Sequence, residues 1–316
     1  MSRTGILIVT HNSAGHIGAC LDALNTVRAT GDVVLVIDNA STDHTAHAVA
    51  GKQDIRFVQN KANAGFAGAV NQGFRLLLDD QVDDVLLLNP DVILRSPLHD
   101  LKAACRRSGL ACGRLTGIDG KTQIGFSFRR FPTPFTLLFE TVGVNRMWPS
   151  NPVNRRYRCL DVDHDVAGEV EQPAGAMLMV RKDVWTLVGG FDEDFHPVWF
   201  EDVDFCRRAA TAGFRAAYIP TLEGTHAGGH SVLQIPNQSR RRYWYASLLR
   251  YSRKHFGRAG RGLVAVGIGG AAMVRSVGAL SQEESAGAAK LGSRVLNEGI
   301  PSTKNTERML KRLHAR

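Results

Sequence analysis

Residues 33–43 read VVLVIDNASTD, and this stretch decides the fold. Residues 33–37 form a continuous apolar run dominated by β-branched side chains, which is typical of a strand buried on both faces. The run ends at Asp38 and Asn39, and a helical pattern with a Ser/Thr/Asp start follows over residues 41–50. A strand followed directly by a helix is the repeating unit of an α/β protein with a parallel sheet.

The same unit recurs on both sides of this stretch. Further strands are predicted at residues 5–10 (GILIVT), 55–58 (IRFV) and 85–88 (VLLL). The helical patterns between and after them cover residues 17–27, capped by Asn12 or Ser13, residues 66–78, and a segment opened by Ser96 and Pro97. This alternation predicts a mostly parallel, Rossmann-like sheet with helices on both faces.

Polar side chains follow several of these strands. Ligands of open α/β sheets bind beyond the carboxyl ends of the strands, so residues at those ends are expected to converge. The residues concerned are Thr10, Asn12, Asp38, Asn39, Asn89 and Asp91.

The second half of the chain is less regular. Residues 119–160 carry several Pro and Arg residues, and no element is predicted there. Strands are expected at 176–180 and 215–220, and helices from Lys182, near Glu201 and from Ser239 onward. The predicted division is an α/β domain over 1–237, with halves 1–115 and 116–237, and a basic helical extension over 238–316.

Composition limits the class of protein. The chain has 316 residues and is 44% hydrophobic, which is typical of a globular protein. Its five cysteines are odd in number and include no Cys-x-x-Cys pair, which favours a reducing compartment over a disulfide framework. No secretory signal is recognised, and the longest apolar run, residues 262–274, is shorter than a membrane span requires.

The net charge of +9 is concentrated near the C-terminus. Between Gly224 and Gln282 there is no acidic residue, while nine Arg and Lys residues occur. Such a segment suits phosphate, nucleic acid or an anionic membrane surface. A solvated basic face is the alternative.

Three stretches of the first half have both a functional and a structural interpretation. Asp38 can accept hydrogen bonds from a nucleotide base or ribose, or it can cap the helix that follows. Asp91 can bind a divalent cation and so neutralise a diphosphate, although Asn-Pro-Asp is also a common turn. Residues 63–73, NAGFAGAVNQG, place Gly65 at a helix start, where free N–H groups would favour an anion, or where close packing requires glycine.

The stretch FEDVDFCRR at 200–208 puts three carboxylates at a helix start. Acids there suit the helix dipole, but one acid would be enough. Asp202 is expected to share the inward face with Phe205 and Cys206, and an inward carboxylate is suited to proton abstraction. His226 and His230, in THAGGHS, have a spacing compatible with metal ligands, although a single histidine is more often structural.

Together these stretches resemble the inverting nucleotide-sugar glycosyltransferases of family 2, which have the GT-A fold. The resemblance covers about residues 4–235. Within the family the chain is most similar to rhamnosyltransferase-type members that build bacterial cell-surface polysaccharide. The motifs that carry the resemblance are VTHNS (9–13), VIDNASTD (36–43), NAGFAGAVNQG (63–73), LLNPDV (87–92), GGFDEDF (189–195), FEDVDFCRR (200–208) and HAGGHS (226–231).

The resemblance implies the roles of the donor site. The nucleoside diphosphate, dTDP or UDP, would be held in the 1–115 half. The metal ligands would be Asp91 and His226, with manganese or magnesium as the cation. This sequence has Asn89 where many members have the first Asp of an Asp-x-Asp motif, which leaves the strength of metal binding open. The donor-binding residues would be Thr10, Asn12, Asp38, Asn39, Asn63, Gly65, Asn89 and Asp91.

It also implies the roles of the acceptor half. Asp202 would be the general base, and Trp199 and Glu201 would lie on the acceptor side. The acceptor would be a glycan or a polyprenyl-linked saccharide. The enzyme would be cytoplasmic and held on the inner face of the plasma membrane by the basic segment, whose Tyr and Trp residues suit a lipid interface.

Two other functions compete with this one. A nucleotidyltransferase would need a glycine-rich loop with Arg or Lys directly after the first strand, and VTHNSAGHIG lacks both. A non-catalytic nucleic-acid-binding protein would explain the basic segment but would leave Asp38, Asp91 and Asp202 without a role. No nucleic-acid partner is therefore expected.

Overall fold

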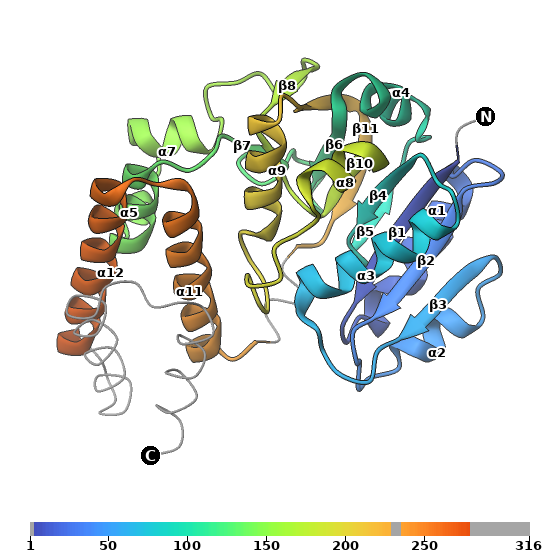
Figure 1. Cartoon of the computed structure of the whole chain (residues 1–316), viewed down its shortest axis with the longest axis horizontal. Helices are drawn as coiled ribbons and strands as arrows, with labels where there is room; N and C mark the ends of the chain where they lie inside the picture. Colours follow the sequence, from blue (N-terminus) through green and yellow to red (C-terminus); the bar gives the residue numbers. More distant parts are fainter. Residues whose placement is uncertain (1–2, 229–234, 279–316) are drawn as a thin grey trace. The chain divides into compact units, whose positions relative to one another are not determined.

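The computed structural model describes residues 3–228 and 235–278 (Figure 1). It divides into two compact units. The first, here called the sheet unit, comprises Met1–Phe131 and Arg158–Pro236. The second, the helical unit, comprises Pro132–Tyr157 and Asn237–Arg316.

A nine-stranded sheet in the order β3-β2-β1-β4-β10-β6-β11-β5, with β8 beside β11, forms the centre of the sheet unit. A separate two-stranded ribbon pairs β7 with β9. The strands are β1 Thr4–Thr10, β2 Val33–Asp38, β3 Ile55–Gln59, β4 Asp84–Leu88, β5 Val92–Leu94, β6 Gly109–Thr116, β7 Phe128–Arg129, β8 Gly168–Val170, β9 Gln172–Pro173, β10 Met177–Arg181 and β11 Arg215–His226.

The first four strands pair in parallel. β1 lies between β2 and β4, so that Thr10 is opposite Asp38 and Ile8 is opposite Leu88. β10 runs antiparallel between β4 and β6, whereas β11 is parallel to β6. The predicted GT-A type of sheet is therefore confirmed, with antiparallel strands inserted in its second half.

Apolar side chains fill both faces of this sheet, which explains the unbroken apolar runs of the sequence. Along β1, Ile6 lies in one buried cluster and Leu7 in the other, because successive side chains point to opposite faces. The helices of the sheet unit cover the two faces (Figure 1). They are α1 Ala14–Val27, α2 Thr45–Ala50, α3 Gly65–Asp79, α4 His99–Ser108, α8 Lys182–Val188 and α9 Glu201–Thr211.

The helical unit is built from α5 to α7 and two long helices. α12 packs closely on α5: a Cβ atom at Gly267 would lie 2.6 Å from a methyl group of Leu138, so a larger residue there would force the Leu138 side chain to move. In the part of the chain that the structure describes, no helix is long and apolar enough to span a bilayer. The helices are α5 Pro134–Val142, α6 Val144–Met147, α7 Pro152–Tyr157, α11 Asn237–His255 and α12 Arg258–Gly278.

The structure differs from the sequence-based expectations in several places, and it forms β7 and α5 to α7 within residues 119–160, where no element was predicted. Residues 132–157, assigned from the sequence to the α/β domain, group with the C-terminal helices, because α5 packs on α12. α2 begins at Thr45 rather than near residue 41, because residues 41–44 form a hydrogen-bonded turn. β6 was not predicted. The part of the predicted extension beyond residue 278 lies outside the described residues.

Candidate active site

The carboxyl edge of the sheet carries a network of polar side chains around Asp38. Asp38 is fully buried at the end of β2, and its Oδ1 accepts hydrogen bonds from the hydroxyls of Thr10, at 2.9 Å, and Ser41. Its Oδ2 accepts from the Ser41 N–H at 3.1 Å and the Gln59 amide at 3.3 Å. The structure thus joins Thr10 and Asp38 as predicted, and it uses the carboxylate to hold the turn after β2.

Asn39 likewise holds the loop before α3 in place through hydrogen bonds. Its Nδ2 donates to Asn63 Oδ1 at 2.8 Å and to the Gly65 carbonyl at 3.1 Å, and its Oδ1 accepts from the Ala64 N–H at 2.9 Å. Asn39, Asn63 and Gly65 are therefore brought together.

The expectation of free N–H groups does not hold for the first two residues of α3. The N–H groups of Gly65 and Phe66 donate to Asn63 Oδ1 and to the Pro197 carbonyl. The glycine is needed for packing instead. Gly65 has φ +77°, and a Cβ atom there would lie 2.5 Å from the imidazole Nδ1 of His196.

Asn12 connects the loops after β1 and β2. It has φ +50°, and its Oδ1 accepts from the Thr42 N–H at 2.8 Å, while its own N–H donates to the Ser41 hydroxyl. Asparagine tolerates this left-handed conformation better than most residues. The loop geometry that would face a nucleoside is therefore fixed before any ligand binds.

Asp91 and His226 meet at the ends of β4 and β11. Both side chains are buried, and His226 Nε2 lies 3.6 Å from Asp91 Oδ1, too far for a hydrogen bond. The other oxygen, Asp91 Oδ2, accepts the Gly228 N–H at 3.1 Å. His226 Nε2 has no hydrogen-bond partner among the described residues. Burial lowers the pKa of His226, against the opposing effect of the Asp91 charge.

Two residues that the sequence did not indicate complete this part of the site. The His226 ring stacks on Phe126, with centroids 4.8 Å apart, and its Nδ1 lies 2.9 Å from Gln123 Oε1. Both come from the segment 117–127, which carries no regular pattern, so no sequence signal would have identified them. Described His, Cys, Asp and Glu residues form no cluster of three that could hold a metal by themselves. His230 lies outside the described residues.

The three acids of α9 have separate environments. Asp204 is fully buried and pairs with Arg208 at 2.8 Å, so it is a structural residue. Asp202 is half-buried, and its Oδ2 accepts the Gly175 N–H at 3.0 Å. Glu201 is buried, and its Oε2 has no hydrogen-bond partner in the described chain. The predicted inward position therefore belongs to Glu201 and Asp204, and Asp202 is the more accessible acid.

Electrostatics separates the two neighbouring acids Glu201 and Asp202. Burial, and then the charge of Asp202, raise the pKa of Glu201 well above its usual range. Burial also raises the pKa of Asp202, but the N–H groups of Gly175 and Val203 act against it. Two adjacent carboxylates disfavour joint ionisation, and burial favours the protonated form more strongly at Glu201 than at Asp202.

Backbone contacts link Asp202 to the end of β4. Gly175 donates to Asp202, and the carbonyl of the next residue, Ala176, accepts the Asn89 N–H at 2.9 Å. One dipeptide therefore connects the candidate base to the strand end that precedes Asp91. Trp199 and Phe200, directly before α9, have φ values of +79° and +71°, which are rare for aromatic residues and often mark functional loops.

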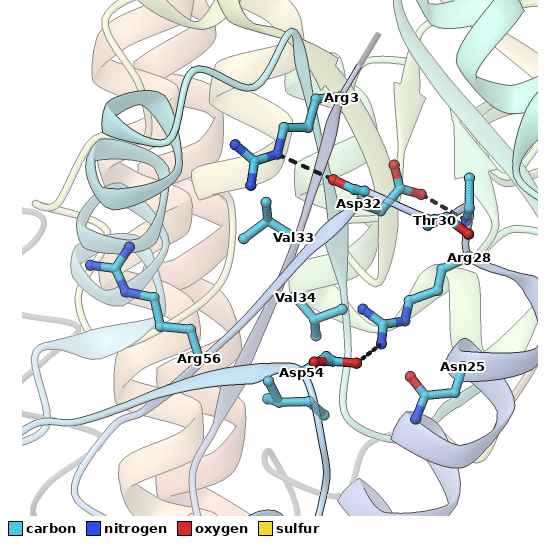
Figure 2. A pocket seen from close by; sticks show the side chains of 12 residues that line it. Arg3, Asn25, Arg28, Thr30, Asp32, Val33, Val34, Asp54 and Arg56 are labelled. Carbon is cyan, nitrogen blue, oxygen red and sulfur yellow. Dashed lines mark hydrogen bonds and ion pairs between the residues drawn. The ribbon is translucent and has the colours of Figure 1, made fainter. Parts of the chain in front are cut away.

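A hollow with a volume of about 750 Å³ lies at the opposite edge of the sheet (Figure 2). Figure 2 shows Arg3, Arg28 and Arg56 around it. Their charges are already engaged: Arg28 lies 3.8 Å from Asp54, Arg56 pairs with Asp80 at 2.9 Å, and Arg3 donates to the backbone carbonyls of residues 31 and 80. It contains none of the predicted site residues.

Comparison with known proteins agrees with the fold and identifies the family. The family model "Glycosyl transferase family 2" matches residues 5–139. An N-acetylglucosaminyl-diphospho-decaprenol L-rhamnosyltransferase from Mycobacterium tuberculosis is 30% identical over 248 residues, covering 73% of this chain and 78% of that protein. The rhamnosyltransferase WbbL from Escherichia coli is 27% identical over 245 residues, covering 71% of this chain and 83% of WbbL.

A solved structure shows the same fold at lower identity. The mannosyltransferase PcManGT from Pyrobaculum calidifontis, in complex with GDP-mannose and Mn²⁺, superposes with a TM-score of 0.51 at 16% identity, covering 99% of this chain and 85% of that one.

The fold and its carboxyl-edge site thus define an enzyme of the GT-A class. The similarity in sequence is more specific, and the chain belongs to glycosyl transferase family 2. The protein is a glycosyltransferase, and the nucleotidyltransferase and nucleic-acid-binding alternatives are set aside.

Proposed function

We propose that the enzyme transfers rhamnose from a nucleoside-diphosphate donor, dTDP- or UDP-linked, to a hydroxyl of a polyprenyl-linked saccharide, with inversion at the anomeric carbon. The sugar and acceptor follow the names of the two bacterial relatives, both rhamnosyltransferases and one acting on a decaprenol-linked acceptor. The observation that carries the proposal is the accessible Asp202 carboxylate, tied through residues 175 and 176 to the strand end before Asp91.

Asp202 would remove the proton from the acceptor hydroxyl as its oxygen attacks the anomeric carbon. The Gly175 N–H holds one carboxylate oxygen in place. The raised pKa of Glu201 would reduce the competition between the two neighbouring carboxylates for ionisation. A base that is positioned and ionised in this way typically contributes ~10²–10⁴-fold to the rate.

The loops around Asp38 and Asn39 would receive the nucleoside. Their side chains are committed to protein hydrogen bonds, so we expect them to shape the nucleoside pocket rather than to supply most of the ligand contacts themselves. Asn12, which is half-buried between the two loops, would lie beside the donor.

Asp91 Oδ1 and His226 Nε2 would hold a divalent cation together with the donor diphosphate. The fit rests on the buried Nε2, which has no hydrogen-bond partner among the residues that the structure describes, and on its 3.6 Å separation from Oδ1, a distance at which two atoms can ligate one ion. A bound cation would neutralise the charge that develops on the leaving nucleoside diphosphate. The Mn²⁺ in the mannosyltransferase complex supports this assignment.

The experiment is a panel of nucleotide sugars assayed for release of nucleoside diphosphate, with Mn²⁺, with Mg²⁺ and with EDTA. We expect release from a rhamnosyl donor in the presence of a saccharide acceptor, and loss of that release with EDTA. Turnover of GDP-mannose alone, or full activity in EDTA, would contradict the sugar or the cation assignment respectively.

We also propose that the helical unit holds the enzyme on the inner face of the plasma membrane. Over residues 132–157 and 237–278 there are twelve Arg and Lys residues and one acid, Glu140. Each basic residue near an anionic surface contributes on the order of 1 kcal/mol. Of the aromatic residues of α11, Tyr245 and Tyr251 are buried and are therefore poor candidates for lipid contact.

The apolar contact is better supplied by Met147 and Trp148, at the end of α6. They are 77% and 57% exposed and follow the exposed Arg146. We expect cosedimentation with anionic liposomes that weakens with salt and with Trp148→Ala. Leu187→Ala, which removes an equally exposed apolar residue from the sheet unit, is the matched control. Equal binding to neutral liposomes would contradict the proposal.

A further inference from the structure

Gln123 makes two hydrogen bonds to one residue. Its Nε2 donates to the backbone carbonyl of His226 at 2.9 Å, and its Oε1 lies 2.9 Å from Nδ1 of the same histidine. Because the amide has one donor end and one acceptor end, the first bond fixes which end faces the ring. The oxygen faces Nδ1, so Nδ1 must carry the hydrogen.

The backbone around Gln123 is held firmly enough to impose this choice. Its N–H donates to the Leu115 carbonyl at 2.8 Å, and its carbonyl accepts the N–H groups of Phe126 and Ser127 at 3.0 Å. Phe126 in turn stacks on the imidazole, with ring planes 17° apart. The His226 ring therefore has little freedom to turn over.

The neutral imidazole then presents a bare lone pair at Nε2. That atom is buried, has no hydrogen-bond partner in the described chain, and faces Asp91 Oδ1 at 3.6 Å. The Nε2 lone pair and the carboxylate oxygen repel each other. A cation bound between them would be coordinated by both atoms. The Gly228 N–H occupies Asp91 Oδ2 and so directs Oδ1 to this point.

We propose that Gln123 is a positioning residue that selects the Nδ1–H tautomer of His226 and thereby makes Nε2 a ligand for the divalent cation. The inference rests on the proposed cation site. The inference also predicts which cation binds more tightly. Since imidazole nitrogen is a softer ligand than oxygen, a fixed Nε2 ligand favours Mn²⁺ over Mg²⁺.

The tautomer can be measured on the unmodified enzyme. Long-range ¹H–¹⁵N spectra of ¹⁵N-histidine-labelled protein without metal should show one buried imidazole protonated at Nδ1 and bare at Nε2, and a His226→Gln sample assigns the signal. Protonation at Nε2, alone or together with Nδ1, would overturn the proposal, because the ring would then face Asp91 as a donor.

Binding of Mn²⁺, followed by electron paramagnetic resonance of the free ion, provides the second test. Gln123→Met keeps the side-chain length and removes the acceptor, and we expect Mn²⁺ affinity to fall about 10–100-fold, the usual effect of removing a partner of a metal ligand. Mg²⁺ affinity should fall less. Gln123→Glu keeps an acceptor toward Nδ1 and should retain the affinity to within a few-fold.

The exposed Gln53→Met is the matched control and should bind Mn²⁺ as the wild type does. Asp91→Ala separates the two levels of the proposal. If it leaves Mn²⁺ binding unchanged, the cation site itself is wrong. If it abolishes binding while Gln123→Met leaves the affinity unchanged, the site stands and only the role of Gln123 is wrong.

Discussion

Both edges of the central sheet bury ionisable side chains, but these are paired at one edge and left open at the other. At the amino edge, Lys102 Nζ lies 2.7 Å from both oxygens of Asp32, and the same carboxylate accepts the Ala29 N–H at 3.0 Å. At the carboxyl edge, Asp91 and His226 face each other with Nε2 unpartnered among the described residues. Buried charges that are fully paired stabilise a fold, whereas a buried polar atom left open points to a ligand.

The contrast also explains why the hollow at the amino edge carries no function in our interpretation. It is concave and contains arginines, but each of these is engaged by an aspartate or a carbonyl. Concavity and composition would select this edge, whereas the open pair of Asp91 and His226 favours the other.

The largest effect is expected from breaking the pair at the amino edge. Lys102→Met leaves a buried, unpaired Asp32 carboxylate and should lower the free energy of unfolding by about 3–5 kcal/mol. Urea denaturation measures it. The double variant Asp32→Asn/Lys102→Met removes both charges and should recover most of the loss. A single variant as stable as the wild type would show that the pair has no structural role.

At the carboxyl edge, Asp202→Asn should lower turnover about 100-fold or more and leave donor affinity nearly unchanged. Since the pKa of Asp202 is raised, turnover should fall on the acid side at a pH above the ordinary value of 3.8 for aspartate. Measurements of kcat across pH and of donor binding by calorimetry test both statements.

Asp204→Asn is the comparison variant for this experiment. It breaks the ion pair with Arg208 and should reduce stability without a comparable loss of turnover. If Asp204→Asn or Glu201→Gln lost turnover while Asp202→Asn kept it, the base would be misassigned.

Much of the fold could be predicted from the sequence, since strands buried on both faces are read directly from runs such as residues 33–37. β6 could not, because GLACGRLT mixes small and polar residues, and the sheet around it decides its conformation. The helices of residues 132–157 were missed for a related reason: α5 is stabilised by packing on α12, more than a hundred residues away.

For the candidate site, the sequence could indicate which residues to consider, but not how they contact one another. Carboxylate and imidazole side chains such as those of Asp91, His226 and Asp202 are candidates for metal binding or proton transfer by their residue type alone. The Gly175 N–H stabilises the ionised form of Asp202, and the Gln123 amide decides which ring nitrogen of His226 is bare. Both are contacts between distant segments that no local pattern contains.

A third prediction tests the proposed cation site at the carboxyl edge. Asp91→Ala removes one of two proposed protein ligands, so the gain in donor affinity that Mn²⁺ provides should disappear, with a loss of about tenfold or more. Calorimetric titration of the nucleoside diphosphate with and without Mn²⁺ measures it. Asp100→Asn, at the exposed start of α4, is the control. An unchanged Mn²⁺ effect would remove Asp91 from the site.

The smallest effect concerns Asp84, an exception to the pairing at the amino edge. It is fully buried at the start of β4, and neither carboxylate oxygen has a hydrogen-bond partner in the described chain. Burial raises its pKa, although Thr4 and the charge of Lys102 oppose the effect. A raised pKa in the folded state means that the contribution of Asp84 to stability is full below the unfolded value and is lost as the pH rises through the folded value.

Asp84→Asn removes this titration and keeps the shape of the side chain. Because the amide carries no charge, we expect a gain in the free energy of unfolding near neutral pH, where wild-type Asp84 bears the cost of a buried charge, and a smaller gain as the pH falls toward 4. Urea unfolding of both proteins from pH 4 to pH 8 gives the difference curve. A difference that does not change with pH would mean that Asp84 titrates alike in the folded and unfolded chains, and the amino edge would then have no exception to its pairing.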